Sequence, residues 1–177
     1  MVLEMLMESV FAVVDIFWVA HLGTDAAATV GLTESLLTLI YALAIGLSIG
    51  ATATIARRIG EQNPDGAARA AVQSIAIAIF VSLIIAIVGA PLAPKLLKLM
   101  GGSPWVIEHG SSFTRVMLAG NITVVMLFMV NATFRGAGDA AIAMRTLWLA
   151  NAINIALGPC LIFGLGPFPK LGIVGAA

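Results

Sequence analysis

The acidic residues of the first apolar stretch are the side chains in this sequence best suited to chemistry. Glu4, Glu8 and Asp15 lie in the otherwise almost wholly apolar positions 1–22. At about 100° per residue, the three fall within about 40° of one another on a helix, so they share one face. A charge at the bilayer centre costs about 2.5–3.5 kcal/mol, so such a face turns toward protein or a water-filled cavity. Asp15 is therefore a candidate for handling a proton or cation, and Glu8 a candidate for lining the same cavity.

Amide side chains in later apolar runs could complete such a site. Asn151 and Asn154 are three residues apart and share a helix face, and Asn131 lies in the preceding run. Pro159 has no backbone N–H and crowds the carbonyl of Ile155, which predicts a kink or local unwinding. Amides, a loosened backbone and a carboxylate from another helix are the parts of a cation or proton site. The alternative, in which the amides only tie helices together, stays open at this point.

A competing, enzymatic interpretation comes from the Gly-x-Gly-Asp pattern of Gly136, Gly138 and Asp139, which intramembrane aspartyl proteases use. Such proteases need two aspartates close together, and Asp15 is the only other candidate within a span. However, Asp139 lies in a connecting link beside Arg135. We therefore interpret the glycines as a helix C-terminal turn and Asp139 as the cap of the next helix, and we expect no catalytic residues and no enzyme.

The composition predicts an integral membrane protein. The 177 residues are 60% hydrophobic and only 10% charged, whereas a soluble domain has about 25% charged residues. Lys plus Arg and Asp plus Glu number nine each, which excludes a basic face for nucleic acid. We expect no cofactor and no firm metal site; a bound metal, if any, would be a monovalent cation near Asp15 and Asn154.

The apolar runs predict an all-α, polytopic helical bundle. Five membrane spans are expected at about 1–22, 32–56, 70–94, 114–134 and 143–166, and a sixth begins at about 172. Gly46 and Gly50 lie four residues apart in the second span, and this pair of small residues predicts close packing against a neighbouring helix of the protein. Basic residues favour the links after spans two and four (Arg57, Arg58, Arg69, Arg135 and Arg145). This bias predicts that the N-terminus lies on the cytoplasmic side of the membrane. The expected location of the protein is the cell membrane.

Several motifs, in order and spacing, resemble those of the MATE (multidrug and toxic compound extrusion) transporters. They are Asp15-Ile16-Phe17-Trp18-Val19-Ala20-His21-Leu22-Gly23, Val30-Gly31-Leu32, Ala56-Arg57-Arg58-Ile59-Gly60, Phe134-Arg135-Gly136-Ala137-Gly138-Asp139, Met144-Arg145, Asn151-Ala152-Ile153-Asn154-Ile155 and Leu161-Ile162-Phe163-Gly164-Leu165-Gly166-Pro167-Phe168-Pro169.

The resemblance implies a cation-coupled antiporter that exports organic, often cationic, compounds in exchange for protons or sodium ions. It implies twelve helices in two six-helix lobes around a V-shaped cleft, of which 1–177 resembles most of the N-terminal lobe. The expected partners are small organic substrates, the lipid bilayer and the C-terminal lobe of the same transporter. Asp15 and Asn154 match the family's ion-coupling residues in this lobe. Gly158 stands where the family often has Asp, so coupling would rest on Asp15, on Asp15 with Glu8, or on the other lobe.

Other functions remain as alternatives to the antiporter. A related flippase of lipid-linked oligosaccharides would need basic residues in its cleft, but no Lys or Arg lies inside a charge-free span. A membrane scaffold without transport would not need the carboxylates of the first span. Because the sequence ends within an apolar segment, we expect a fragment of a longer chain; a half-transporter that forms dimers is the alternative.

Overall fold

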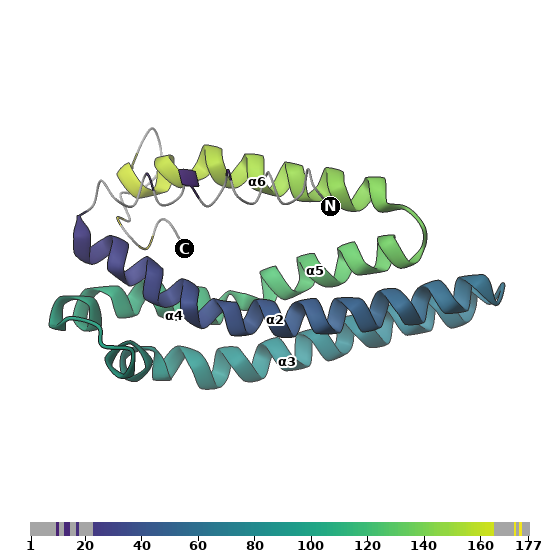
Figure 1. The fold of residues 1–177 in the computed structure, drawn as a ribbon, viewed down its shortest axis with the longest axis horizontal. Helices are drawn as coiled ribbons and strands as arrows, with labels where there is room; N and C mark the ends of the chain where they lie inside the picture. The colour runs from purple at the N-terminus through teal and green to yellow at the C-terminus, as the bar shows by residue number, and fades with distance from the viewer. Residues whose placement is uncertain are drawn as a thin grey trace.

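The computed structural model describes residues 23–164 and the single positions 10, 13, 14, 17, 172 and 174. Five α-helices and one π-helical stretch make up residues 23–164 (Figure 1). They are α2 (Thr24–Gly60), α3 (Pro64–Leu99), the π-helical η1 (Val106–Gly110), α4 (Ser111–Ala119), α5 (Asn121–Gly136) and α6 (Ala140–Phe163). The described residues form no strand, so the predicted all-α class holds for this part of the chain.

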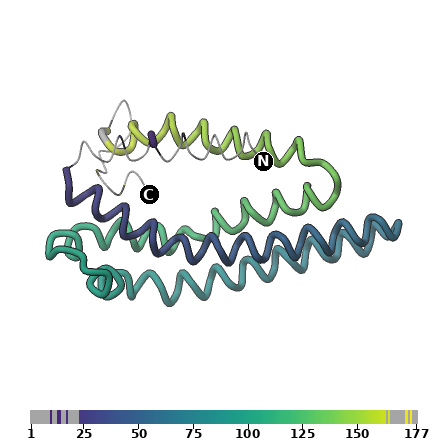
Figure 2. The backbone as a smooth tube through the Cα atoms, in the orientation of Figure 1, coloured from purple at the N-terminus to yellow at the C-terminus, as the bar shows by residue number. Residues whose placement is uncertain are grey.

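A tight turn joins the two longest helices, α2 and α3. Gln62 takes a left-handed backbone conformation with φ of 53°, which reverses the chain after α2. Asn63 then caps α3, because its Oδ1 accepts a hydrogen bond from the N–H of Gly66 at 2.8 Å. Pro64 occupies the first helical turn, where its missing N–H costs nothing. The two helices therefore run back along each other as a hairpin (Figure 2).

The core lies where α2, α3 and α5 meet. α2 packs against both α3 and α5, α3 also packs against α4, and α6 folds back from the end of α5 and packs on it (Figures 1 and 2). The main buried cluster combines large side chains with alanines, which lets the helices come close. Its members are Leu37, Ile40, Ala44, Ala51, Ala78, Ala93, Leu118, Val125, Met129 and Ala132.

The third long helical unit is broken once, at Gly120. Between α4 and α5, the side chain of Asn121 donates from Nδ2 to the carbonyl oxygens of Leu118 at 2.6 Å and of Ser82 on α3 at 3.1 Å. Asn121 is almost fully buried. A carbonyl freed inside an apolar bundle needs a partner, so this amide stabilises the break and fastens it to α3.

A second close contact joins α2 to η1 and α4. Thr29 is fully buried, and a Cβ placed on Gly110 would lie only 2.5 Å from its Oγ1 and Cγ2. One turn further, the hydroxyls of Thr33 and Thr114 share a buried hydrogen bond of 2.8 Å. Hydroxyls and a glycine let the two backbones approach more closely than branched apolar side chains would.

Four helical units of the described residues are long and apolar enough to cross a membrane: Thr24–Gly60, Pro64–Leu99, Val106–Gly136 and Ala140–Ile162. They correspond to the predicted spans two to five. The first predicted span and the start of the sixth lie outside the residues described continuously. Large apolar side chains along α3 are exposed, as expected of a helix that faces lipid: Val72, Ile77, Ile79, Phe80, Leu83, Ile84, Ile87, Val88 and Leu92.

The described residues bear on two local expectations. No described atom lies within 4 Å of a Cβ placed on Gly46 or Gly50, so the predicted close packing of this pair has no partner among the described residues and stays a prediction. The helix α6 continues through Pro159 to Phe163 without unwinding, and the alternative of a kink at Pro159 stays a prediction. Proline keeps φ near −65°, a helical value, so the ring removes one backbone hydrogen bond and the helix goes on.

Candidate functional site

The amide of Asn151 is the most conspicuous polar group on α6. Its side chain is 9% exposed, and its Nδ2 has no hydrogen-bond partner in the described part of the chain. A buried donor without a partner costs about 1–3 kcal/mol. Asn154 lies three residues on, about 60° around the helix, and is exposed. α6 thus carries one buried and one accessible amide on neighbouring parts of its surface.

Asn131 on α5 is also buried, and here the acceptor atom of the amide is the one without a described partner. It is 6% exposed, and its Oδ1 accepts no hydrogen bond from a described residue. Because α5 and α6 are antiparallel about the turn at 137–139, Asn131 and Asn151 are offset by roughly 9 Å along the helices. The two amides therefore do not form one direct pair, and each lacks its own ligand: a donor for Asn131 and an acceptor for Asn151.

The two predicted carboxylates of this site, Asp15 and Glu8, lie outside the described residues. The grouping of Asp15 with Asn154 accordingly stays a prediction. Among the described residues, no cluster of three or more His, Cys, Asp or Glu side chains could hold a metal ion.

The residues of the Gly-x-Gly-Asp pattern lie together at the turn between α5 and α6. Gly138 has φ of 92°, a conformation that favours glycine, and Asp139 caps α6 by accepting from the N–H of Ile142 at 3.2 Å. This is the turn and cap that the sequence predicts. Gly136 has a second role that the sequence does not reveal, because a Cβ there would lie 3.0 Å from the carbonyl oxygen of Thr52 on α2. Arg135 is exposed beside the turn.

Glu34 is an acidic residue that the sequence analysis did not single out. It lies about 15 Å along α2 from the start of the helix, on an exposed part of its surface. Carboxylates within membrane helices are functional candidates by default. The available signal was its place directly before the charge-free positions 35–56, which contain no other acidic or basic side chain.

Comparison with known proteins identifies the family. The family model described as MatE matches residues 1–160. The probable multidrug resistance protein NorM of Thermotoga maritima is 31% identical over 175 residues, which are 98% of this chain and 38% of that protein. The FAD transporter of Shewanella oneidensis is 29% identical over 94% of this chain and 37% of its own length.

A solved structure also shares the fold of this chain. The outward-facing conformation of a multidrug resistance MATE family transporter of the MOP superfamily superposes with a TM-score of 0.88 and 35% identity, over 98% of this chain and 38% of that one. This chain therefore spans less than two fifths of the length of the proteins it matches. The matched residues, the four apolar helices and the shared fold together show that the chain belongs to the MatE family of membrane transporters.

Proposed function

We propose that this chain forms most of the N-terminal lobe of a secondary antiporter, which exports small organic molecules as protons or sodium ions enter. Membership of the family supports this class of activity. The observation that carries the proposal to particular residues is the buried amide of Asn151, whose Nδ2 has no hydrogen-bond partner among the described residues, one turn from the accessible Asn154. A transport protein has a use for such a group, because an ion, a water molecule or a carboxylate can satisfy it in one state and leave it in another.

In this proposal Asp15 is the coupling carboxylate and Asn154 the amide beside it. Glu8, Asn131 and Asn151 line the same cavity. Taking up a proton or a monovalent cation at Asp15 changes the local charge by one unit, which is a large bias on helix packing at low dielectric. No cofactor takes part, and the chain performs no covalent chemistry.

The second lobe is the partner that this proposal needs. Positions 1–177 act as part of an N-terminal lobe, and the C-terminal lobe supplies the opposite wall of the substrate cleft. The N-terminus lies in the cytoplasm and the protein resides in the cell membrane. The relatives' names include both multidrug resistance and FAD transport, so the substrate class of this protein is kept as small organic molecules.

The decisive experiment compares two Asp→Asn substitutions in the full-length protein. Asp15→Asn removes the coupling charge and is expected to abolish efflux from proteoliposomes while membrane insertion is unchanged. Asp139→Asn is the matched control, because it also removes one carboxylate but leaves an equally good helix cap. Efflux that persists in Asp15→Asn at the level of Asp139→Asn would remove Asp15 from the mechanism.

The same preparation separates the two coupling ions. Efflux driven by an imposed pH gradient without sodium supports proton coupling, and efflux driven only by a sodium gradient supports sodium coupling. Asn154→Ala is expected to weaken whichever gradient drives transport. If Asn154→Ala responds to both gradients like the unmodified protein, Asn154 is not part of the coupling site.

A further inference from the structure

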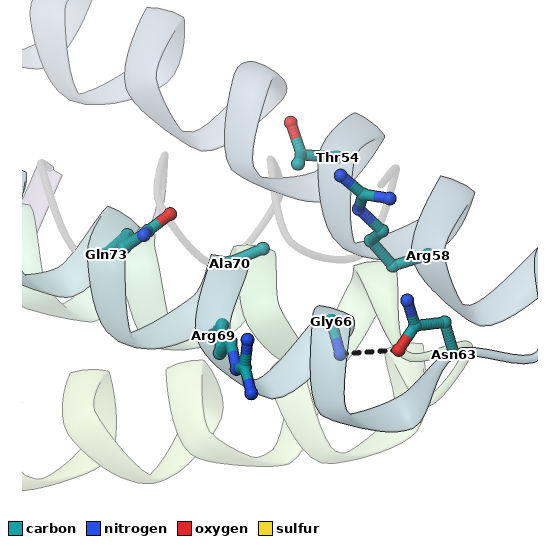
Figure 3. Close-up of a pocket in the computed structure, with 7 residues that line it drawn as sticks. All are labelled: Thr54, Arg58, Asn63, Gly66, Arg69, Ala70 and Gln73. Carbon is teal, nitrogen blue, oxygen red and sulfur yellow. Dashed lines mark hydrogen bonds between the residues drawn. The ribbon is translucent and has the colours of Figure 1, made fainter.

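A cavity with both polar and apolar lining lies at the α2–α3 turn, away from the amides on α5 and α6. Its volume is about 310 Å³. Thr54 and Arg58 line it from α2, Asn63 lines it from the turn, and Arg69 and Gln73 line it from α3 (Figure 3). Two guanidinium groups and two side-chain amides around one cavity suit an anion with several oxygen atoms, such as a phosphate.

The arginines at this cavity can still donate hydrogen bonds to an anionic ligand. Glu61 accepts from Arg57 at 2.9 Å and from Arg58 at 3.1 Å, so one carboxylate is shared between two guanidinium groups. These bonds, that of Arg57 first, lower the pKa of Glu61. Arg69 forms no ion pair with a described residue and is exposed. With Asp65 as the remaining acid, three arginines face two carboxylates at this turn.

The other polar side chains of the cavity can also form further hydrogen bonds. The Oδ1 of Asn63 is taken by the N–H of Gly66, which leaves its Nδ2 as a donor. Figure 3 shows this bond, with the amide nitrogen on the side toward Arg58. Thr54 donates its hydroxyl to the carbonyl of Gly50 at 2.8 Å, so its oxygen can still accept. The cavity thus offers donors for phosphate oxygens and one acceptor for a hydroxyl of the headgroup.

The depth of the cavity matches the headgroup region of a bilayer. α2 is about 55 Å long and the hydrocarbon core only about 30 Å thick, so the ends of the helix extend beyond the core. The charge-free positions 35–56 of α2 end just before Arg58, and those of α3 begin just after Arg69. Both arginines therefore lie at the boundary between hydrocarbon and headgroups.

An apolar track leads from the cavity toward the membrane interior. Arg69, Gln73, Ile77, Phe80 and Ile84 recur every three or four residues, so they follow one face of α3. Ile77, Phe80 and Ile84 are 51%, 64% and 48% exposed. A cationic group, an amide and then exposed apolar side chains form the sequence of contacts that a phospholipid requires from phosphate to acyl chain.

We propose that this cavity binds the headgroup of an anionic phospholipid, with Arg58 and Arg69 on the phosphate and the acyl chains along Ile77, Phe80 and Ile84. The lipid holds the ends of α2 and α3 together at the membrane surface. The proposal is independent of the transport cycle, because it uses none of the residues assigned to ion coupling.

The experiment measures lipid binding by the full-length protein reconstituted in nanodiscs that contain phosphatidylglycerol or only phosphatidylcholine. Thermal stability is expected to be higher with phosphatidylglycerol, and labelled phosphatidylglycerol is expected to bind roughly fivefold more weakly to Arg58→Gln and to Arg69→Gln. Arg135→Gln is the control, because it removes the same charge from an exposed arginine at another interhelical turn, does not line the cavity and leaves Glu61 shared as before. Glu61→Gln, which releases Arg58 from its carboxylate, is expected to tighten binding.

Three results would overturn the proposal. Equal stability in the two lipids would remove the preference for an anionic headgroup. A loss of binding in Arg135→Gln as large as that in Arg58→Gln would reduce the effect to general surface charge. Equal protection by inorganic phosphate in phosphatidylcholine nanodiscs would assign the site to a free anion, with no role for the apolar track. Loss of phosphatidylglycerol binding that is confined to Arg58→Gln and Arg69→Gln, with no thermal stabilisation by inorganic phosphate, supports the proposal.

Discussion

The contact between Thr29 and Gly110 makes a sharp prediction about how α2 packs against η1. The substitution Gly110→Ala adds one methyl group, and its carbon would lie 2.5 Å from both the Oγ1 and the Cγ2 of Thr29. Because Thr29 is fully buried, its side chain cannot move into solvent. Either the helices separate or Thr29 leaves its rotamer and gives up its hydrogen bond to the carbonyl of Asp25.

The expected magnitude follows from two opposing effects. Overpacking a close contact costs about 1–3 kcal/mol, and a contact as short as this one belongs at the upper end. Replacing glycine by alanine within a helix returns up to about 1 kcal/mol. The net loss for Gly110→Ala is therefore about 2 kcal/mol.

A double-mutant cycle isolates the contact. Thr29→Ala removes both atoms that the new methyl group would meet, so Gly110→Ala should cost little when combined with it. We expect an interaction free energy of about 1–2 kcal/mol between the two sites, measured by thermal unfolding of the full-length protein in detergent. If Gly110→Ala lowers Tm equally with and without Thr29→Ala, the close approach of α2 and η1 is refuted.

Further predictions concern four other positions. Gly136→Ala should destabilise the protein by about 1–2 kcal/mol because of the close carbonyl on α2, whereas Gly46→Ala, with no described atom within 4 Å, should be neutral or stabilising; equal melting temperatures for these variants would contradict the close α2–α5 contact. Gly158→Asp should be tolerated because no described atom lies within 4 Å of its new Cβ, and it should change the pH dependence of efflux by restoring the acid common in the family. Membrane insertion of Gly158→Asp as poor as that of Leu157→Asp, or a pH dependence of efflux equal to that of the unmodified protein, would contradict this prediction. Asp139→Ala should cost about 1 kcal/mol of stability through loss of the α6 cap, and Asp139→Asn almost none; chemical denaturation of both variants tests this.

A local signal in the sequence predicted the start of α6. The turn and cap before α6 depend on residues within a few positions of one another, Asp139 with Ile142, and the turn before α3 depends in the same way on Asn63 with Gly66. Hydropathy located the four described spans but not the full helices, because a helix can continue beyond the hydrocarbon through residues that are not apolar. Thus α2 begins at Thr24, ahead of the predicted span at about 32.

Contacts between distant residues could not be predicted in the same way. Thr29 and Gly110 are far apart in sequence, and neither the π-helical stretch nor the close approach at Gly136 has a local signature. The spacing of Gly46 and Gly50 does not say which neighbour that face meets, and no described atom lies within 4 Å of a Cβ placed on either glycine. For the candidate site, the sequence named Asn131 and Asn151, and the structure adds that each is buried and that one polar atom of each has no hydrogen-bond partner among the described residues.

The short turn between α2 and α3 has a consequence for biosynthesis. Only Glu61, Gln62 and Asn63 separate the two helices, so the emerging α3 cannot drift far from α2 before the two pair. A closed helical hairpin satisfies its own backbone and buries part of its apolar surface before the rest of the lobe exists. The arginines at its tip resist transfer across the membrane. We therefore expect the hairpin to enter the bilayer as one unit and to serve as the template on which α4, α5 and α6 assemble.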